Sequence, residues 1–391
     1  MTSGAALDLA AAPLATDDVG ALLADACRRA GMRLLAHRRR SVHHREGRSV
    51  SHVFEARVEE AGRTRAVLLV AHVDARPLPE AARGPGRLAG PIAVWRFPDD
   101  PYLPGLPSMV DPPQVHALLS HPTTGEVTLR TRAYRPTRRA VIEVAEDGAP
   151  RWYLKVVAGR RAAALADRHR QLIAHVPVPR VVHVRPEQGV VAFEALPGRT
   201  LRRVLTIGEP APAPDELLEL SQRLAASGLR SSAAPRRFAD PGRHVPLLSS
   251  LAPDLAGTVR RVADEARRVA GPEAPVHGDL HPGQLLLQQG RITGLLDVDG
   301  AGTGLLAQDA GSLVAYVHVL GELHPGVRDD LESYAQAVAD VYRPVVGRAE
   351  LARGTAGAWL ALASTAHRSQ DPDGTATLRR RIRRALAALE T

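Results

Sequence analysis

The fold is decided by one stretch, Val276-His277-Gly278-Asp279-Leu280-His281-Pro282-Gly283-Gln284, which is followed by Gly294-Leu295-Leu296-Asp297-Val298-Asp299-Gly300. Two short apolar runs flank the turn signal Gln289-Gly290, and this pattern predicts a β-hairpin. One acid, Asp279, precedes the first strand of this hairpin, and another, Asp297, follows the second strand. The hairpin therefore brings two carboxylates to the same end of a small sheet.

The order of these polar groups is that of the catalytic loop of phosphoryl-transfer enzymes: an Asp, an amide side chain five residues later and an Asp on the next strand. The stretch resembles the aminoglycoside phosphotransferase and choline kinase family, whose pattern is His-Gly-Asp-x-x-x-x-Asn followed by an Ile-Asp-Phe or similar strand. This chain differs at Gln284, where the family usually has Asn. A chance hairpin with acidic ends is the alternative, and the number of matched positions speaks against it.

Length and composition set the class of protein. The chain has 391 residues and 45% hydrophobic content, enough for two or three domains with proper cores. The sequence has no run of about 18 apolar residues, so no transmembrane helix is expected. The N-terminus lacks the pattern of a signal peptide. Cys27 is the single cysteine, which excludes an intramolecular disulfide and fits the reducing cytoplasm. Its amphipathic surroundings predict a core residue.

The basic residues are almost all arginine. Of 51 Lys and Arg positions only Lys155 is lysine, and asparagine is absent from the chain. An ammonium is a compact point charge and a guanidinium is a planar fork, so the two are not interchangeable at a phosphate. The one retained lysine therefore invites a chemical explanation, and Gln284 is less anomalous in a chain without Asn.

A net charge of +9 and a pI near 10.5 raise the question of nucleic acid. The arginines are spread along the chain, however, and aromatic residues make up only 3%, which leaves few candidates for base stacking. The densest basic run, Arg379-Arg380-Arg381 with Arg383 and Arg384, lies on a predicted C-terminal helix and is interpreted as a solvated face. Nucleic acid is therefore not the expected partner.

The resemblance implies an α+β, protein kinase-like fold with a small β-rich N-lobe and a mainly helical C-lobe, preceded here by an α+β cap. We expect a flexible tail (1–17), a cap domain (18–125), the N-lobe (126–198) and the C-lobe with the catalytic hairpin (199–391). Periodicity and turn signals predict the individual elements. The predicted helices are 17–35, 113–120, 160–175, 215–227, 256–270, 309–320, 328–345, 349–368 and 375–389. The predicted strands are 49–58, 65–73, 140–144, 151–157, 180–184 and 190–194, with short elements around 92–97 in a Pro- and Gly-rich connector (74–113).

Two of the predicted hairpins look alike. Arg45-Glu46-Gly47-Arg48 leads to a strand, a Gly-containing turn and a second strand, and Arg135-Pro136-Thr137-Arg138 does the same. In this alignment Leu69 falls opposite Lys155. One hypothesis is that residues 37–75 are a degenerate, nucleotide-free copy of the kinase hairpin that serves as a cap. Two unrelated hairpins with similar turns are the alternative, and the sequence leaves both open.

The resemblance also implies roles for the residues of the quoted stretch. Asp279 is the expected general base, which orients the attacking hydroxyl. Asp297 is the expected main Mg²⁺ ligand, and Asp299 is a second ligand or an outer-shell partner. Gln284 would coordinate Mg²⁺ through its side-chain oxygen, displaced by the extra methylene.

The nucleotide side of the site is expected on the N-lobe. In the family a strand lysine, here Lys155, contacts the phosphates and pairs with an acid on the following helix, for which Asp167 is the weak candidate. The phosphate loop, 134–139, contains no Gly, so contacts would come from the backbone or from Arg138 and Arg139. The linker that reads adenine through main-chain groups would be Glu194, Ala195 and Leu196. Asp309 is interpreted as a helix cap or a brace of the loop.

The acceptor is expected to be a small hydroxylated molecule, because few residues separate Asp299 from the next helix and leave little room to seat a peptide. The long N-terminal extension, together with the motif His-Gly-Asp-Leu-His-x-Gly-Gln at 277–284, also resembles maltokinase-like sugar kinases, which favours a sugar or aminocyclitol over choline. An aminoglycoside would favour an acid-rich cleft, but residues 305–391 contain ten Arg and ten Asp or Glu. The expected cofactors are ATP and Mg²⁺. The alternative is a pseudokinase that binds nucleotide or protein without transfer, motivated by Gln284 and the Gly-free loop.

Overall fold

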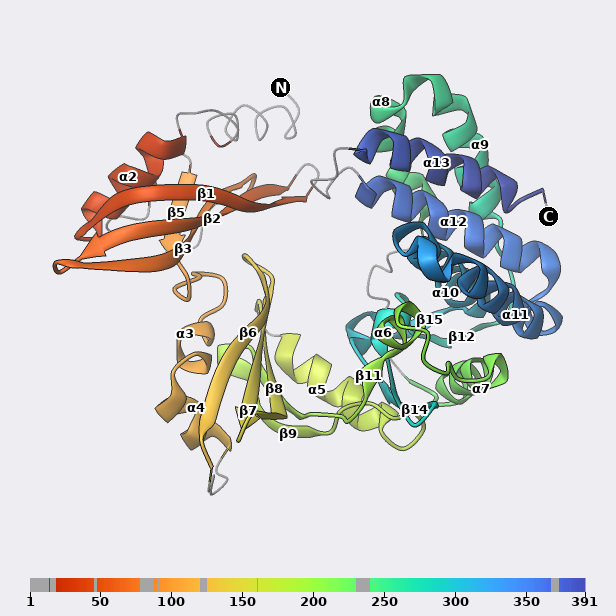
Figure 1. Ribbon diagram of the computed structural model, residues 1–391, viewed down its shortest axis with the longest axis horizontal. Coiled ribbons are helices and arrows are strands. Elements are labelled where there is room, and N and C mark those ends of the chain that lie inside the picture. Colours follow the sequence, from red (N-terminus) through yellow and green to blue (C-terminus); the bar gives the residue numbers. More distant parts are fainter. Residues whose placement is uncertain are drawn as a thin grey trace. The chain divides into compact units, whose positions relative to one another are not determined.

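A computed structural model describes residues 14, 19–45, 48–77, 88–89, 92–119, 125–159, 161–229, 240–366 and 373–390. The chain forms two compact units, Met1–Ala166 with Val181–Ala195 and Asp167–Arg180 with Leu196–Thr391 (Figure 1). Most of the predicted tail lies outside the described residues. Leu14 is described, and it is buried in the core of the first sheet rather than mobile. The first unit is rich in strands and the second in helices.

The first unit begins with a helix on a five-stranded antiparallel sheet. Helix α2 (Val19–Arg29) places Leu23 and Cys27 in a common core with the sheet, as predicted for Cys27. The strand order is β1-β2-β3-β5-β4. The strands are β1 (Met32–Arg45), β2 (Ser49–Glu60), β3 (Arg63–Asp74), β4 (Leu88–Ala89) and β5 (Ile92–Arg96).

The predicted helix 17–35 was too long at its C-terminal end. The chain reaches Gly31 with φ +73°, a left-handed conformation that ends helices, and β1 then starts at Met32. Strand β1 was missed because it is an edge strand, paired on one side only, and most of its side chains are exposed. An edge strand of this kind carries little of the apolar alternation on which strand prediction depends.

A second five-stranded antiparallel sheet has the same strand order, β6-β7-β8-β10-β9. Short helices α3 (Leu106–Met109) and α4 (Pro112–Leu119) pack on one face, and the first part of α5 (Arg161–Leu172) packs on the other. The edge strand β6 was also missed; it is paired on one side only, and none of its nine residues is fully buried. The strands are β6 (Val127–Arg135), β7 (Arg139–Glu146), β8 (Ala149–Val157), β9 (Val181–Arg185) and β10 (Val190–Glu194).

The two sheets also share their turns. In the first sheet the Arg48 N–H donates to the Arg45 carbonyl at 2.9 Å, and the Arg48 carbonyl accepts from the amide after β3 at 2.8 Å. In the second sheet the Arg138 N–H donates to the Arg135 carbonyl at 3.0 Å, and the Arg138 carbonyl accepts from the amide after β8 at 3.0 Å. We call the first sheet (β1–β5) the cap sheet and the second (β6–β10) the N-lobe sheet. Their common strand order and turn hydrogen bonds favour the interpretation of the cap sheet as a structural copy of the N-lobe sheet.

If the two sheets are copies, the alignment of their hairpins that was drawn from the sequence needs one correction. Counted from the shared turns, Ser49 pairs with Asp74 as Arg139 pairs with Val157, so the position of Lys155 is taken by His72 and not by Leu69. The difference of three residues arises because β3 has 12 residues and β8 has 9. His72 is fully buried, and its Nδ1 lies 2.8 Å from the Ser51 hydroxyl.

The second unit is built from helices around two small sheets. Strands β11 (Arg199–Thr200), β13 (Leu285–Gln288) and β14 (Arg291–Leu295) form one sheet, and β12 (Glu273–Val276) and β15 (Gly302–Leu305) form the other. The hairpin β13–β14 and the six predicted helices of this region are confirmed. The six are α7 (Pro214–Ala225), α9 (Ala256–Arg267), α10 (Leu306–Leu323), α11 (Arg328–Val346), α12 (Arg348–Ala366) and α13 (Gly374–Ala387), and the short helices α6 (Leu201–Thr206) and α8 (Val245–Leu251) were not predicted. No helix in the described part of the chain is long and apolar enough to cross a membrane.

Two glycines set the distance between α10 and α12. A Cβ at Gly311 would lie 2.3 Å from the backbone of Gly354, and a Cβ at Gly354 would lie 2.0 Å from the carbonyl oxygen of Ala307. No side chain fits at either position without separating the helices. The backbone of α10 is therefore positioned directly by the backbone of α12.

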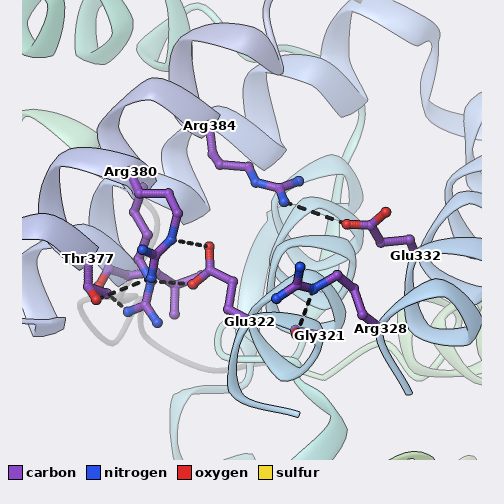
Figure 2. Close-up of polar contacts among 9 residues, drawn as sticks. Gly321, Glu322, Arg328, Glu332, Thr377, Arg380 and Arg384 are labelled. Carbon is purple, nitrogen blue, oxygen red and sulfur yellow. Dashed lines mark hydrogen bonds and ion pairs between the residues drawn. The ribbon is translucent and has the colours of Figure 1, made fainter. Parts of the chain in front are cut away.

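The basic run on α13 is only in part the solvated face that the sequence suggested, because Arg380 and Arg383 are exposed but Arg381 is buried. Figure 2 shows Arg380 reaching Glu322 of α10 and Arg384 reaching Glu332 of α11, at 3.4 and 3.7 Å. Arg381 shares Glu322 at 3.2 Å, and both of these side chains are nearly buried. Arg379 pairs with Asp254. These arginines thus fasten α13 to the helical unit, and their charge is largely compensated.

The cap sheet should lose stability in mild acid. Burial, together with the nearby Arg39, lowers the pKa of His52 to about 4, and burial lowers the pKa of His72. In the unfolded chain both titrate near 6.5, so between about pH 6.5 and 4 the unfolded state binds more protons and the folded state is disfavoured. We expect roughly 3 kcal/mol of lost stability from His52 at the acid end of this window. Thermal unfolding followed by circular dichroism from pH 7 to pH 4.5 measures the effect.

The matched comparison is between two histidine variants of the same sheet. His52→Gln should flatten the fall of the melting temperature with pH, whereas His37→Gln, which removes an exposed ring on β1, should follow the wild type. Equal slopes for all three proteins would contradict the assignment.

Candidate active site

The loop that carries Asp279 leaves its sheet at the end of β12. Val276 is the last residue of β12, and a 3₁₀ turn over Pro282–Gln284 leads directly into β13. Strand β14 ends at Leu295, two residues before Asp297. The structure thus places Asp279, Gln284, Asp297 and Asp299 together in the second unit, on this loop and on the turn after the hairpin.

His277 ties the two acidic segments to each other. Its Nε2 lies 2.8 Å from the carbonyl oxygen of Leu296, and its Nδ1 accepts the N–H of Asp279 at 3.3 Å. A carbonyl can only accept, so Nε2 carries the proton and Nδ1 does not. One fully buried ring therefore holds the amide of Asp279 and the residue before Asp297 in a fixed relation.

Asp309 fixes the start of the same loop. Its carboxylate accepts the N–H of His277 at 2.6 Å and the N–H of Gly278 at 2.9 Å, and the residue is only 3% exposed. Ser312, three residues further along α10, donates to the carbonyl of Leu280 at 2.8 Å. Asp309 lies in the first turn of α10 rather than at its N-cap, so it is the predicted loop brace and not a cap.

The backbone at Asp297 is left-handed, with φ 53° and ψ 42°. This conformation is uncommon outside glycine, and Asp and Asn are among the residues that tolerate it. It turns the chain from β14 into the 3₁₀ turn Val298–Gly300. Such a backbone at an acidic residue after a strand is typical of functional sites.

Asp299 has a cationic neighbour that the sequence did not reveal. Burial lowers the pKa of Arg168 on α5, and the negative charge of Asp299 opposes this shift. Arg168 therefore lies close enough for its charge to act on Asp299. The position next to it, Asp167, was the predicted acid partner of Lys155. Asp167 instead has a side chain that is 61% exposed and pairs with Arg170 at 3.0 Å, which gives that pairing no support.

Gln284 is held by His281. The His281 Nδ1 accepts the N–H of Gly283 at 3.0 Å, so its Nε2 carries the proton. The Nε2 of Gln284 lies 3.2 Å from this Nε2, and two donors cannot bond to each other. The amide must therefore be turned end over end, so that its oxygen accepts from His281. One lone pair of that oxygen is then used by the ring.

Lys155 lies in the middle of the second sheet of the first unit. It is paired with Val141 on β7 and Val191 on β10, and it is 8% exposed. Since side chains alternate along a strand, it shares a face with Val157, which packs against α5. The one lysine of the chain is thus a central-strand residue, not an edge residue.

The Gly-free loop 134–139 is braced by Asp100. This carboxylate, 2% exposed, accepts the hydroxyl of Tyr134 and the N–H of Thr137, both at 2.9 Å, and burial raises its pKa. The loop's N–H groups at Thr137 and Arg138 are therefore already engaged within the protein. Sequence reasoning missed Asp100, because it lies in the Pro-rich connector and no periodic pattern links it to the loop.

The predicted linker residues follow β10 directly. Glu194 ends the strand and is exposed, and the Ala195 N–H donates to the Arg151 carbonyl at 2.9 Å. The boundary between the two units falls between Ala195 and Leu196. Together with Lys155, Arg138 and Arg139, Glu194 and Ala195 belong to the first unit, whereas Leu196 and the acidic set belong to the second.

A model of the phosphotransferase enzyme family matches residues 137–353, which is more than half of the chain. The chain belongs to the phosphotransferase enzyme family. The match begins within the Gly-free loop 134–139 and includes the loop at Asp279 and the hairpin that follows it. Residues 1–136, with the cap sheet, lie outside the family model.

Solved structures show the kinase-like fold of this phosphotransferase. A choline/ethanolamine kinase family protein from Mesorhizobium loti is 19% identical, with a TM-score of 0.51, and the match covers 72% of this chain and 95% of that one. A thermostable mutant of the aminoglycoside phosphotransferase APH(4)-Ia is 16% identical over 67% of this chain and 95% of that one, with a TM-score of 0.48. An amicoumacin kinase in complex with AMP-PNP, Ca²⁺ and Ami is 16% identical, with a TM-score of 0.46, and the match covers 72% of this chain and 94% of that one. No curated protein matched this phosphotransferase.

Asp309→Asn should loosen the loop of this phosphotransferase. The amide is nearly isosteric, but it can accept only one of the two N–H groups, and its own NH₂ then faces the other. Losing a charge-assisted, buried hydrogen bond costs about 2–3 kcal/mol. We expect a lower melting temperature and faster proteolysis within 277–284, measured by circular dichroism and mass spectrometry.

The control is Asp329→Asn on α11, which removes an exposed carboxylate from the first turn of another helix. If both variants melted and were cleaved alike, the brace would have no special role.

Proposed function

We propose that this phosphotransferase moves the γ-phosphate of ATP to a hydroxyl group of a small molecule and requires Mg²⁺. The observation that carries the proposal is the connection made by His277, which sets Asp279 and the Asp297 segment in a fixed relation before any ligand binds. Phosphoryl transfer depends mainly on positioning and charge stabilisation, and a preorganised pair of carboxylates supplies both.

Asp279 is proposed to accept a hydrogen bond from the acceptor hydroxyl and to take its proton as the oxygen attacks the γ-phosphorus. Its backbone amide is bonded to His277, which orients the residue. A positioned general base of this kind contributes on the order of 10²–10⁴-fold to the rate.

The donor set for Mg²⁺ is proposed to be Asp297, Asp299 and the oxygen of Gln284. Carboxylate and amide oxygens suit this ion, which needs only one or two protein carboxylates when phosphates and water complete its shell. No group of three or more His, Cys, Asp or Glu in the described ranges could hold a metal by itself. Bound Mg²⁺ would neutralise phosphate charge. Arg168, whose charge acts on Asp299, would compete with the metal ion for that carboxylate.

Lys155 is proposed to contact the nucleotide phosphates, with Arg138 and Arg139 of the phosphate loop. Main-chain groups near Glu194, Ala195 and Leu196 are proposed to read the base, with the Ala195 N–H already used by Arg151.

The proposed acceptor is a sugar or aminocyclitol hydroxyl, ahead of an aminoglycoside. The second candidate function is a pseudokinase that binds nucleotide without transfer. The engagement of Gln284 by His281 favours it, because a Gln oxygen that is already hydrogen-bonded is a weaker metal ligand than a free one.

Asp279→Asn should separate the two functions. We expect the wild type to release ADP in the presence of at least one member of a panel of sugars, aminocyclitols and aminoglycosides. The variant should lose about 10²–10⁴-fold in kcat, because the amide cannot accept the proton, and it should bind ATP as the wild type does. Coupled ADP release and calorimetric ATP binding measure the two effects. A wild type that binds ATP but transfers no more phosphate than Asp279→Asn across the panel would establish the pseudokinase.

Lys155→Arg tests the lysine with its charge retained. The guanidinium is larger and planar, so it should not replace a point charge between Val141 and Val191, and we expect kcat/KM for ATP to fall at least about tenfold. Arg130→Lys on the exposed face of β6 makes the opposite exchange and should leave kcat/KM unchanged. Near-normal kinetics for Lys155→Arg would place the phosphates elsewhere.

A further inference from the structure

A chain of hydrogen bonds leads from the cap sheet to the Gly-free loop 134–139. The indole N–H of Trp95 on β5 donates to the hydroxyl oxygen of Tyr134 on β6 at 3.0 Å. That hydroxyl donates to Asp100 at 2.9 Å, and the same carboxylate oxygen accepts the N–H of Thr137 at 2.9 Å. An indole can only donate and a phenol has a single proton, so the direction of the chain is fixed. Three hydrogen bonds thus connect a side chain of the cap with the backbone of the loop.

The backbone at the end of this chain is strained. Thr137 has φ +63°, in the left-handed region, which is an outlier for a β-branched residue. Such a conformation persists only where the surrounding structure imposes it, and it is frequent at ligand-binding sites. The restraint is Asp100, which is itself fixed by Tyr134 and by the N–H of Tyr102 at 2.9 Å. The shape of the loop therefore depends on a carboxylate that is far from it in the sequence.

The cap sheet fixes the position of Trp95. The residue is 3% exposed, pairs with Val70 of β3 and packs in a small apolar core of the cap sheet. Its ring centroid lies 5.7 Å from that of His72, and the His72 Nδ1 lies 2.8 Å from the Ser51 hydroxyl. The indole therefore cannot turn away from Tyr134 without disturbing the core of the cap.

The restraining side chains lie outside the segment that the family model matches. That segment starts at Thr137, so the strained residue is the first matched one. Trp95, Asp100 and Tyr134 all precede it. The loop 134–139 has no glycine that would adopt positive φ without strain, and the hydrogen bonds from the preceding part of the chain take the place of that freedom.

We propose that Trp95 is a positioning residue for nucleotide binding, which acts through Tyr134 and Asp100 on the Gly-free loop. The inference rests on the proposed function, in which two arginines of this loop, Arg138 and Arg139, contact the nucleotide phosphates. Trp95 keeps the strained backbone in place, and that backbone sets where the two arginine side chains begin. The cap thus contributes to nucleotide binding without contacting the nucleotide.

Trp95→Phe and Tyr134→Phe test the proposal in the full chain, because each removes one hydrogen bond and keeps an aromatic ring. Their controls are Trp359→Phe and Tyr342→Phe, which make the same two changes in the buried core of the second unit. Calorimetry with AMP-PNP and with adenosine measures nucleotide binding. Hydrogen–deuterium exchange of residues 134–139 measures the restraint on the loop.

We expect Tyr134→Phe to bind AMP-PNP about tenfold more weakly and Trp95→Phe at least about threefold more weakly, because a hydrogen bond to a buried carboxylate is lost or weakened. Adenosine, which has no phosphate, should bind unchanged. Exchange at 134–139 should be faster in both variants. The two controls should melt at a lower temperature than the wild type and keep its binding and exchange. The double variant Trp95→Phe/Asp100→Asn should bind AMP-PNP as weakly as Asp100→Asn alone, because both changes act through one carboxylate.

The outcomes keep this proposal apart from the proposed function. If Trp95→Phe and Tyr134→Phe matched the wild type in AMP-PNP binding or in exchange at 134–139, the positioning role would be wrong. Additive losses in the double variant would also contradict it. A wild type that does not bind AMP-PNP would refute the proposed function instead. Exchange in Trp95→Phe would then decide whether the cap holds the loop: faster exchange at 134–139 would support this role, and unchanged exchange would overturn it.

Discussion

The carboxylate of Asp309 is the point on which the acidic half of the site depends. A buried carboxylate is costly unless its lone pairs are used, and here the backbone N–H groups of His277 and Gly278 use them. The first turn of α10 adds a favourable field for a negative charge. Once His277 is fixed by its backbone, its ring can reach Leu296 and Asp279. A single ionised side chain thus organises both the loop before the hairpin and the turn after it.

Much of the fold was predictable because local patterns agree with tertiary structure. The hairpins with Ala61-Gly62, Asp147-Gly148 and Gln289-Gly290 turns were all predicted from the glycine of the turn, and both turn residues have positive φ, as tight two-residue hairpin turns require. The amphipathic helices of the second unit were predicted for the same reason. The edge strands β1 and β6 were not, since exposed arginines replace the apolar alternation. Their existence is decided by pairing with a neighbouring strand, which is a tertiary property.

The residues of the candidate site also fall into those that local sequence predicts and those that only the tertiary structure reveals. Asp279, Gln284 and Asp297 follow from spacing within a short stretch of sequence, and their positions on the loop and hairpin are as expected. Arg168 and Asp100 lie far away in sequence from the groups they meet, and no local pattern marks them.

The contact between Gly311 and Gly354 gives the loop a remote determinant. Asp309 and Ser312 lie within two residues of Gly311, so a methyl group added at Gly354 would push α10 and carry both loop contacts with it. The loop at Asp279 and its hairpin cannot therefore be transferred alone to another protein, because their geometry depends on a helix that begins some fifty residues later. In a protein-engineering experiment, α12 would have to be transferred together with the loop.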